Sequence, residues 1–202
     1  PNMITREGVM GNEYYKFSQK MTPEHNVTLA FTRLLAGQMD YTPGGFLNVT
    51  QKEFKRQCPT LVSNTRAAEL AKFVIYESPY TVFCDHPDNV YGQVGEDFLQ
   101  IVPTTWDDIL FLDGTPDTYV AIAKKSGNKW FIGILNNSEE RTVNLDLSSL
   151  TNGSATLEYW QDGKKANVDA KACDHKTMTL KAGKKLTVKM ANAGGYVGIL
   201  SL

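Results

Sequence analysis

The sequence predicts an α/β segment followed by an all-β domain: the last units of a (β/α)8 barrel and then an antiparallel β-sandwich. Up to about Pro103, apolar residues recur at the spacing of one helix face. Beyond that point they alternate with a period of two, and all three tryptophans lie in this second part. We therefore divide the chain into residues 1–103, the C-terminal portion of the barrel, and residues 104–202, the sandwich.

Four elements are expected in the first part, in the order strand, helix, strand, helix. Residues 2–8 form a candidate strand. Residues 27–35 follow as a helix, because their apolar side chains recur at offsets 0, 3, 4, 7 and 8. Residues 38–45 form a buried strand that runs into a Pro-Gly turn. The same helical offsets return at residues 67–75, directly after an Asn-Thr pair that can cap a helix.

Two strand-helix units cannot form a stable parallel sheet by themselves. Strands of that kind need helices outside and neighbouring strands on either edge. If the first part closes a (β/α)8 barrel, about six further strands are expected before Pro1. The chain begins Pro-Asn-Met, which agrees with the tail of something longer. We therefore expect the missing N-terminal part of the same protein to be its partner.

The second part has the pattern of an antiparallel sandwich. Apolar residues alternate in six short runs, and turn sequences rich in Gly, Asn and Ser separate those runs. Short strands at a spacing of about ten residues are typical of two packed antiparallel sheets. The six expected strands cover residues 119–123, 130–134, 143–147, 157–159, 186–190 and 196–200.

Composition and charge exclude two classes of function. The chain has 21 Lys and Arg against 22 Asp and Glu, a formal net charge of −1, so a protein that neutralises nucleic-acid phosphates is not expected. Charged and polar residues interrupt every apolar stretch before the roughly 18 residues that a membrane span needs. No N-terminal signal peptide is expected either, because no basic region followed by an apolar one is present.

The cysteines and histidines do not form a metal-binding pattern. Cys58, Cys84 and Cys173 make no CxxC pair, and the three histidines are scattered along the chain. We expect free buried thiols. A bridge between Cys58 and Cys84 is the alternative in an oxidising compartment.

The densest group of reactive side chains lies near the N-terminus, in TREGVMGNEY at residues 5–14. Glu7 and Glu13 stand six residues apart across two glycines, just after the first candidate strand. Loops at this position build the active site of a β/α barrel. The two carboxylates could bind Ca²⁺, or one could act as a general acid while the other holds its surroundings in place. Solvated surface groups are the plain alternative, because Glu is mostly exposed in proteins.

Four motifs carry a family resemblance. They are TREGVMGNEY at residues 5–14, PEHNVTL at 23–29, FTR at 31–33 and LAGQMDYTPG at 35–44. Together they resemble the C-terminal end of the catalytic barrel of glycoside hydrolase family 97. The second part, from about Pro103, looks like the C-terminal β domain of that family. Ala30 and Gln38 depart from the family pattern, which has proline at both positions.

The resemblance implies a calcium-dependent, exo-acting α-glycosidase, an α-glucosidase or an α-galactosidase, with an α-glycoside or oligosaccharide substrate. Glu13 matches the general acid, and Glu24 is the alternative. Glu7 matches a calcium-binding carboxylate, and the acid Glu13 also lies at the metal. The second catalytic carboxylate, a base or a nucleophile, lies upstream in the family. Members are usually exported, so a periplasmic or secreted location is implied, and residues 1–202 alone are expected to bind calcium poorly and hydrolyse nothing.

Two other functions stay open for the second part. In a carbohydrate-binding module, Trp106, Trp130 and Trp160 would stack on sugar rings, although core packing is the commoner role of such side chains. Alternatively, the sandwich only braces the barrel, with Phe98, Leu99 and Ile101 at the joint. Exposure of the tryptophans distinguishes these two possibilities.

Overall fold

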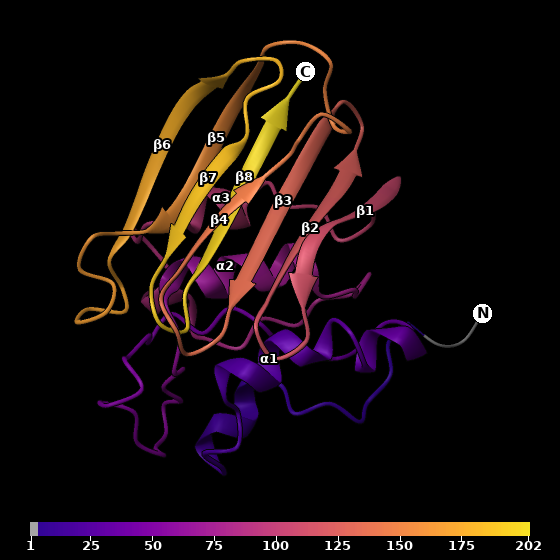
Figure 1. The fold of residues 1–202 in the computed structure, drawn as a ribbon. Coiled ribbons are helices and arrows are strands. Elements are labelled where there is room, and N and C mark those ends of the chain that lie inside the picture. The colour runs from indigo at the N-terminus through magenta and orange to yellow at the C-terminus, as the bar shows by residue number, and fades with distance from the viewer. Residues whose placement is uncertain (1–3) are drawn as a thin grey trace.

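The computed structural model describes residues 4–202 and consists of two antiparallel β-sheets partly enclosed by the N-terminal half of the chain (Figure 1). The N-terminal half contributes helices and extended loops, and the strands all lie beyond residue 107. The helical elements are short. They are η1 (Asn12–Lys16), α1 (Pro23–Leu29), η2 (Arg33–Ala36), α2 (Arg66–Ile75), η3 (Pro87–Asn89) and α3 (Glu96–Leu99), where η denotes a 3-10 helix.

A six-stranded sheet and a two-stranded sheet form the sandwich. The large sheet has the order β1-β2-β3-β8-β5-β6, the small one pairs β4 with β7, and every pairing is antiparallel. This confirms the antiparallel architecture expected for the second part. The strands are β1 (Asp108–Thr115), β2 (Tyr119–Ser126), β3 (Lys129–Asn136), β4 (Arg141–Leu145), β5 (Ala155–Asp162), β6 (Cys173–Leu180), β7 (Leu186–Met190) and β8 (Gly195–Ser201).

The two edge strands of the large sheet, β1 and β6, are absent from the predicted set. In β1, the outward Ile109 and Phe111 are as apolar as the inward residues, so no clean alternation marks the strand. In β6, most side chains are exposed and polar, because only one neighbour and little core lie against it. A period-two sequence pattern needs an apolar inward face and a polar outward face. The outward face of β1 is partly apolar, and β6 has almost no buried face.

Helix α2 lies across the face of the large sheet that is opposite to β4 and β7 (Figure 1). It confirms the helix expected at residues 67–75, and the Thr65 hydroxyl caps it by accepting from the Ala68 N–H. The helix approaches the sheet closely because glycines face it. A Cβ at Gly133 would stand 2.9 Å from the Cβ of Val74, and one at Gly195 would stand 2.6 Å from the Cα of Ala68.

Two apolar cores result from this layering. One lies between the two sheets and contains, among others, Ile132, Leu157 and Val188. The other lies on the opposite face of the large sheet and joins α2 with residues of both halves of the chain, including Val120 and Val197. Because β3 and β8 serve both cores, their side chains are buried on both faces.

The first predicted helix is shorter than expected. Helix α1 starts at Pro23, which Thr22 caps, and ends at Leu29, and a 3-10 turn replaces the second half of the predicted 27–35 helix. The Thr32 hydroxyl donates to the Thr28 carbonyl, a local bond that competes with the helical pattern. Leu35 is 83% exposed, so the apolar face of a continued helix would find no surface to cover.

The two predicted strands of the first part are wrong for the described residues. Residues 4–8 and 38–45 form no strand pairing, and residues 1–3 of the first candidate lie outside the described part. A hydrogen bond of 3.1 Å from the Asp40 N–H to the Arg6 carbonyl nevertheless joins the two segments. Left-handed backbone conformations in both segments interrupt the regular extended geometry that a ladder needs.

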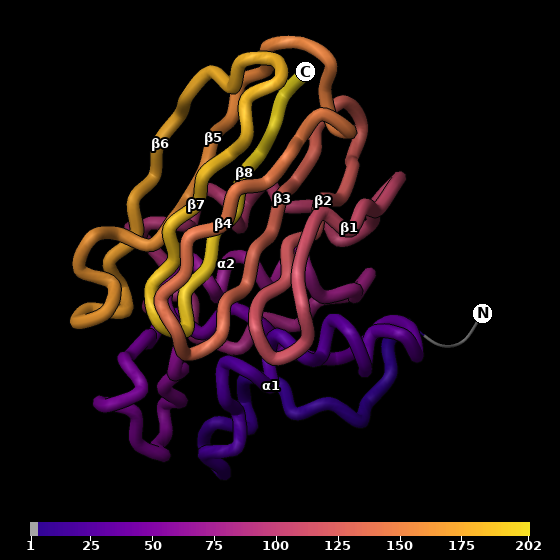
Figure 2. Tube along the Cα trace, in the orientation of Figure 1, coloured from indigo at the N-terminus to yellow at the C-terminus, as the bar shows by residue number. Residues whose placement is uncertain are grey.

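The N-terminal segment passes around the end of the sandwich where β3 ends and β8 begins, while the C-terminus lies at the opposite end (Figure 2). Helix α1 contacts both β2 and β3 at this end. Among residues 4–202, no helix combines the length and the apolar character that crossing a bilayer requires.

Candidate functional site

The two glutamates of the predicted site lie on one loop, and both are exposed. Glu7 precedes Gly8, whose φ of 86° lets the chain turn, and Glu13 occupies the second position of η1. The guanidinium of Arg33 donates to the carbonyl oxygens of Arg6 at 3.0 Å and Glu7 at 3.1 Å. Thus the backbone beside Glu7 is tied to η2, while its carboxylate faces solvent.

The loop approaches the neighbouring extended segment very closely at Gly11. A Cβ on Gly11 would stand 1.9 Å from the carbonyl oxygen of Tyr41, so a side chain cannot fit there. That same oxygen accepts a hydrogen bond of 3.0 Å from the N–H of Asn12. The backbone directly before Glu13 is therefore fixed against residues 38–45.

Beneath Glu13 lies a buried polar network, which we call the Asn12 cluster: Asn12, Tyr41, Glu69 and Lys72. The side-chain amide of Asn12 both donates and accepts a hydrogen bond. Its Nδ2 donates to Glu69 Oε2 at 2.6 Å, and its Oδ1 accepts from Lys72 Nζ at 3.0 Å. Lys72 also donates to the Tyr41 hydroxyl at 3.1 Å and forms an ion pair with Glu69. Asn12, Glu69 and Lys72 have no solvent exposure.

Donors from several segments surround the Glu69 carboxylate. Besides Asn12 and Lys72, it accepts from the N–H groups of Gly44 at 3.0 Å and Gly45 at 3.2 Å, and from the side-chain amide of Asn64. Buried charges are retained when they are paired and hydrogen-bonded in this way. The cluster thereby joins the Glu13 loop, the Pro-Gly turn and α2 at one carboxylate.

Burial governs the ionisation of the groups around this carboxylate. Burial lowers the pKa of Lys72, and the adjacent Glu69 charge opposes that shift. Burial, and secondarily the charge of Glu69, raises the pKa of Tyr15 and of Tyr76 far above the ordinary value. These phenols therefore stay protonated, and the Tyr15 hydroxyl accepts from the side-chain amide of Asn26. The Tyr76 hydroxyl donates to the Asn26 carbonyl at 2.8 Å.

His25 lies in α1, behind the same loop. Burial lowers its pKa, and a hydrogen bond to the backbone of Met10 acts in the opposite direction. Its Nε2 is buried and has no hydrogen-bond partner among the described residues. The cap of α1 is Thr22, so His25 is a packed histidine and not the capping residue.

Glu24, the alternative acid, lies in contact with the sandwich instead. Its carboxylate accepts from the Ser138 N–H at 3.0 Å and from the Ser138 hydroxyl. Burial alone would raise the pKa of Glu24, but the hydrogen bonds from Ser138 hold it below the ordinary value. A carboxyl held ionised in this way is a poor proton donor.

Glu7 and Glu13 carry the oxygen ligands that calcium prefers, but they provide too few of them for a complete site. Within residues 4–202, no three His, Cys, Asp or Glu side chains come together to hold a metal ion. Calcium takes about six to eight oxygen ligands, and two carboxylates supply at most four. Glu7 and Glu13 could be part of a calcium site, but they do not form one by themselves.

The tryptophans do not form a sugar-binding platform. Trp130 and Trp160 are buried, and only Trp106 is partly exposed, with its ring 5.4 Å from that of Phe131. Trp160 packs against Phe98 at 5.2 Å and stacks on His175 at 4.2 Å. The structure therefore contradicts the binding-module alternative, which needs exposed rings.

The joint between the two halves is partly as predicted. Phe98 is buried against Trp160 and Leu99 packs on the same core, but Ile101 is half exposed and contributes little. The prediction of free thiols is confirmed, and the alternative Cys58–Cys84 bridge is not formed. The prediction that they are buried is wrong for Cys58, which lies in an exposed surface loop, and Cys84 and Cys173 are only partly buried.

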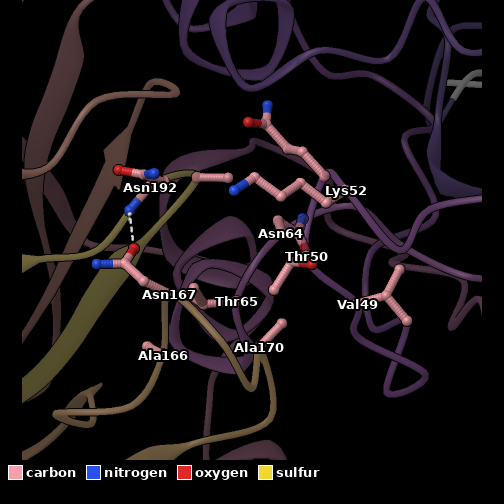
Figure 3. Close-up of a pocket in the computed structure, with 11 residues that line it drawn as sticks. Val49, Thr50, Lys52, Asn64, Thr65, Ala166, Asn167, Ala170 and Asn192 are labelled. Carbon is pink, nitrogen blue, oxygen red and sulfur yellow. Dashed lines mark hydrogen bonds between the residues drawn. The ribbon is translucent and has the colours of Figure 1, made fainter.

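A separate polar cavity of about 90 Å³ lies between the loop at residues 49–52, the start of α2 and the loop at residues 166–170 (Figure 3). Asn192 donates its N–H to the side chain of Asn167 at 2.8 Å on one wall. The cavity includes neither Glu7 nor Glu13. It is therefore distinct from the predicted site.

Sequence patterns identified Glu7 and Glu13 but not the Asn12 cluster. Glu69 and Lys72 stand three residues apart in α2, a spacing that on most helices marks a solvated ion pair. Only the covering of this face by residues 11–45 buries them. One sequence feature could have indicated the cluster. Asn12 stands directly before Glu13, in a loop that also contains two glycines.

Comparisons with known proteins show where this geometry belongs. Residues 105–201 match the domain family described as "Glycosyl-hydrolase 97 C-terminal, oligomerisation". A retaining α-galactosidase of Bacteroides thetaiotaomicron is 30% identical over 200 residues, which is 97% of this chain. A family 97 enzyme of Pseudoalteromonas sp. strain K8, solved with acarbose, superposes over 100% of this chain with a TM-score of 0.88 and 32% identity. The chain belongs to glycoside hydrolase family 97.

Two further relatives of this family 97 chain carry an activity in their names, one the same and one different. A probable retaining α-galactosidase of Streptomyces bingchenggensis is 30% identical over 98% of the chain. A β-arabinopyranosidase structure matches 98% of it with a TM-score of 0.76 and 26% identity. The chain spans 28–30% of the length of the curated relatives, and 32% of the Pseudoalteromonas enzyme.

Proposed function

We propose that this chain is the C-terminal part of an exo-acting α-glycoside hydrolase that releases glucose or galactose from an oligosaccharide or other α-glycoside. One observation carries the proposal. In a chain of glycoside hydrolase family 97, Glu13 is exposed to solvent while the residue before it, Asn12, is completely buried in a hydrogen-bonded ion-pair cluster. A reactive carboxyl on a rigidly held backbone is what general acid catalysis requires.

We propose further that residues 1–103 close a (β/α)8 barrel. A backbone hydrogen bond from Asp40 to Arg6 joins residues 38–45 to residues 4–8, which supports their being neighbours as the last two strands of a barrel would be. Large exposed apolar side chains are also concentrated in this half, which supports a surface covered in the complete protein. They are Ile4, Tyr14, Phe17, Leu35, Tyr80, Val82, Tyr91, Val94 and Ile101.

In this mechanism Glu13 donates its proton to the glycosidic oxygen as the bond from that oxygen to the anomeric carbon breaks. The leaving sugar departs as an alcohol, and positive charge develops on the ring that stays. A second carboxylate, outside this chain, acts as base or nucleophile. Glu7 lies at the other end of the loop, and we assign both Glu7 and Glu13 to a calcium site completed by upstream residues. Calcium there would supply positive charge that orients substrate hydroxyl groups.

We also propose that the complete protein is periplasmic or secreted, which rests on the resemblance to exported members of the family.

The test is hydrolysis by the full-length protein with Glu13→Gln, in the presence of calcium. Aryl α-galactosides and α-glucosides with good leaving groups are compared with the corresponding disaccharides. A general acid matters little when the leaving group needs no proton. We expect disaccharide hydrolysis to fall by about 100-fold or more, while the aryl substrate loses much less.

Glu24→Gln is the matched control, because Glu24 lies on the next helix and contacts the sandwich. We expect it to leave the ratio of the two rates unchanged. Equal losses on both substrates for Glu13→Gln would assign Glu13 to metal binding or folding. No release of monosaccharide by the unmodified protein would overturn the proposed function.

A further inference from the structure

We propose that Asn12 is a positioning residue for the acid Glu13, and that Glu69 and Lys72 of α2 hold Asn12 in place. This inference rests on the proposed function. It assigns a role in the reaction to three buried residues that lie outside the Glu7 and Glu13 pair.

Hydrogen bonds hold both the side chain and the backbone of Asn12. Its side chain donates to Glu69 at 2.6 Å and accepts from Lys72 at 3.0 Å, and its backbone N–H donates to Tyr41 at 3.0 Å. Three hydrogen bonds in different directions fix both the backbone and the side chain. No other residue type of this size has the donor and the acceptor that the two charged partners require.

The Glu69 carboxylate, to which Asn12 is bound, is itself held in place. Glu69 accepts donors from three further places, namely Gly44, Gly45 and Asn64. A carboxylate with this many fixed partners cannot move without leaving a buried donor unsatisfied, and that is costly.

Helix α2 connects these residues to the sandwich. Glu69 and Lys72 belong to α2, which is seated on the large sheet through the close approaches at Gly133 and Gly195. Thus the sheet positions α2, α2 positions Asn12, and Asn12 positions the peptide that carries Glu13. The position of the acid depends on the sandwich although no sandwich side chain is needed at the reacting bond.

A positioning role and a purely structural role of Asn12 predict different losses of rate on the two kinds of substrate. A misplacement of about 1 Å in a reacting group can cost about 100-fold in rate. The loss must be concentrated in reactions that need the proton, because a displaced acid does not affect a leaving group that departs unaided. A purely structural role would lower the amount of folded enzyme and so reduce both rates equally.

The experiment compares the unmodified full-length enzyme with its Asn12→Ala variant in calcium. The readouts are kcat and KM for an aryl α-glycoside with a good leaving group and for the matching disaccharide. We expect kcat for the disaccharide to fall by about 10- to 100-fold, and kcat for the aryl substrate by less than about threefold. We also expect little change in KM for either substrate.

Leu157→Ala is the control for lost stability, since Leu157 is buried between the two sheets and far from the loop. It should lower Tm and leave the ratio of the two kcat values unchanged. If Asn12→Ala does not fold, Tyr41→Phe takes its place, because it removes only the hydroxyl that accepts from Lys72 and donates to Asn26. A shift of about threefold in the same ratio is then expected.

The outcomes separate the two proposals. An active unmodified enzyme whose substrate ratio is unchanged in Asn12→Ala, or in Tyr41→Phe where that variant is used, overturns the positioning role and leaves the proposed function standing. An unmodified enzyme that cleaves no α-glycoside overturns both. A substrate ratio that changes as expected, with the Leu157→Ala ratio constant, supports the positioning role.

Discussion

Lys124 Nζ in β2 lies 2.7 Å from Glu77 Oε2, so an ion pair joins the large sheet to the chain just after α2. The ammonium is almost completely buried, and the ring of Trp106 lies 5.5 Å from it. Burial lowers the pKa of Lys124, and the Glu77 carboxylate opposes that shift. The partners of Lys72 all lie in the N-terminal half, whereas Lys124 connects that half to the sandwich.

The first prediction concerns this pair. Glu77→Ala leaves a buried ammonium without its carboxylate, and we expect the free energy of unfolding to fall by about 2 kcal/mol, below the cost at fully buried pairs because Glu77 is partly exposed. Adding Lys124→Met should recover most of the loss, since no unpaired charge remains. Urea unfolding of the three proteins measures both effects. A change below about 0.5 kcal/mol for Glu77→Ala would show that water replaces the carboxylate.

The second prediction concerns the close approach at Gly11. Gly11→Ala would force the Tyr41 carbonyl away and break its bond to Asn12, so we expect a loss of about 1–3 kcal/mol in unfolding free energy. Gly153→Ala is the control, because nothing lies within 4 Å of the added Cβ. Equal stabilities for the two variants would mean that the loop shifts at no cost.

The third prediction is a pH dependence from Asp162 in β5. Burial raises its pKa from 3.8 to about 6, against hydrogen bonds from Thr65 and from the N–H groups of Ala191 and Gly195. The folded state therefore binds this proton more tightly than the unfolded state. The resulting stabilisation is complete below about pH 4 and is lost as the pH rises through about 6.

Asp162→Asn isolates this group. We expect the unfolding free energy of the unmodified protein, relative to the variant, to fall by up to about 1.4 kcal/mol per pH unit between pH 4 and 6. Denaturant titrations at several pH values provide the measurement. If the unfolding free energy of the unmodified protein relative to Asp162→Asn stayed constant or rose with pH, the raised pKa of Asp162 would be contradicted.

The fourth prediction is spectroscopic. Because Trp130 and Trp160 are buried, acrylamide should quench only the part of the fluorescence that comes from Trp106. Trp106→Phe should therefore remove most of the quenchable emission. Oligosaccharides added to residues 1–202 should leave the spectrum unchanged, and a saturable shift would restore the binding-module hypothesis.

The fifth prediction concerns calcium. Residues 1–202 alone contribute two exposed carboxylates and no three-ligand group within the described range, so about 1 mM calcium should not change their Tm relative to a chelator control. The same calcium should raise the Tm of the full-length protein. A raised Tm in the short chain would mean that further ligands lie within it.

The sequence predicted those elements in which apolar residues recur regularly between turn or capping residues. In helix α2 they recur along one stripe, and in the central strands they recur at every second position. The same reasoning failed at residues 38–45, where Met39 and Tyr41 are buried as expected but the segment has no strand partner among the described residues. It failed again at β6, where an exposed edge strand has no apolar face to recognise.

The sequence could indicate only those residues of the candidate site that stand close together in the chain. Glu7 and Glu13 share one loop, so their spacing is visible in the sequence. The cluster that holds the loop combines residues 12, 41, 69 and 72, and their proximity exists only after α2 has packed on the sheet. A buried ion pair in a helix has the same sequence as an exposed one, and tertiary covering alone distinguishes them.

The glycines at 133 and 195 bear on how this protein could be divided. They let α2 sit so close to the sheet that the core beneath the helix is shared between residues from both sides of position 103. A cut there would leave the sandwich with one open apolar face. Anyone who grafts this domain onto another enzyme must therefore take α2 along, so the smallest transferable unit begins upstream of Thr65.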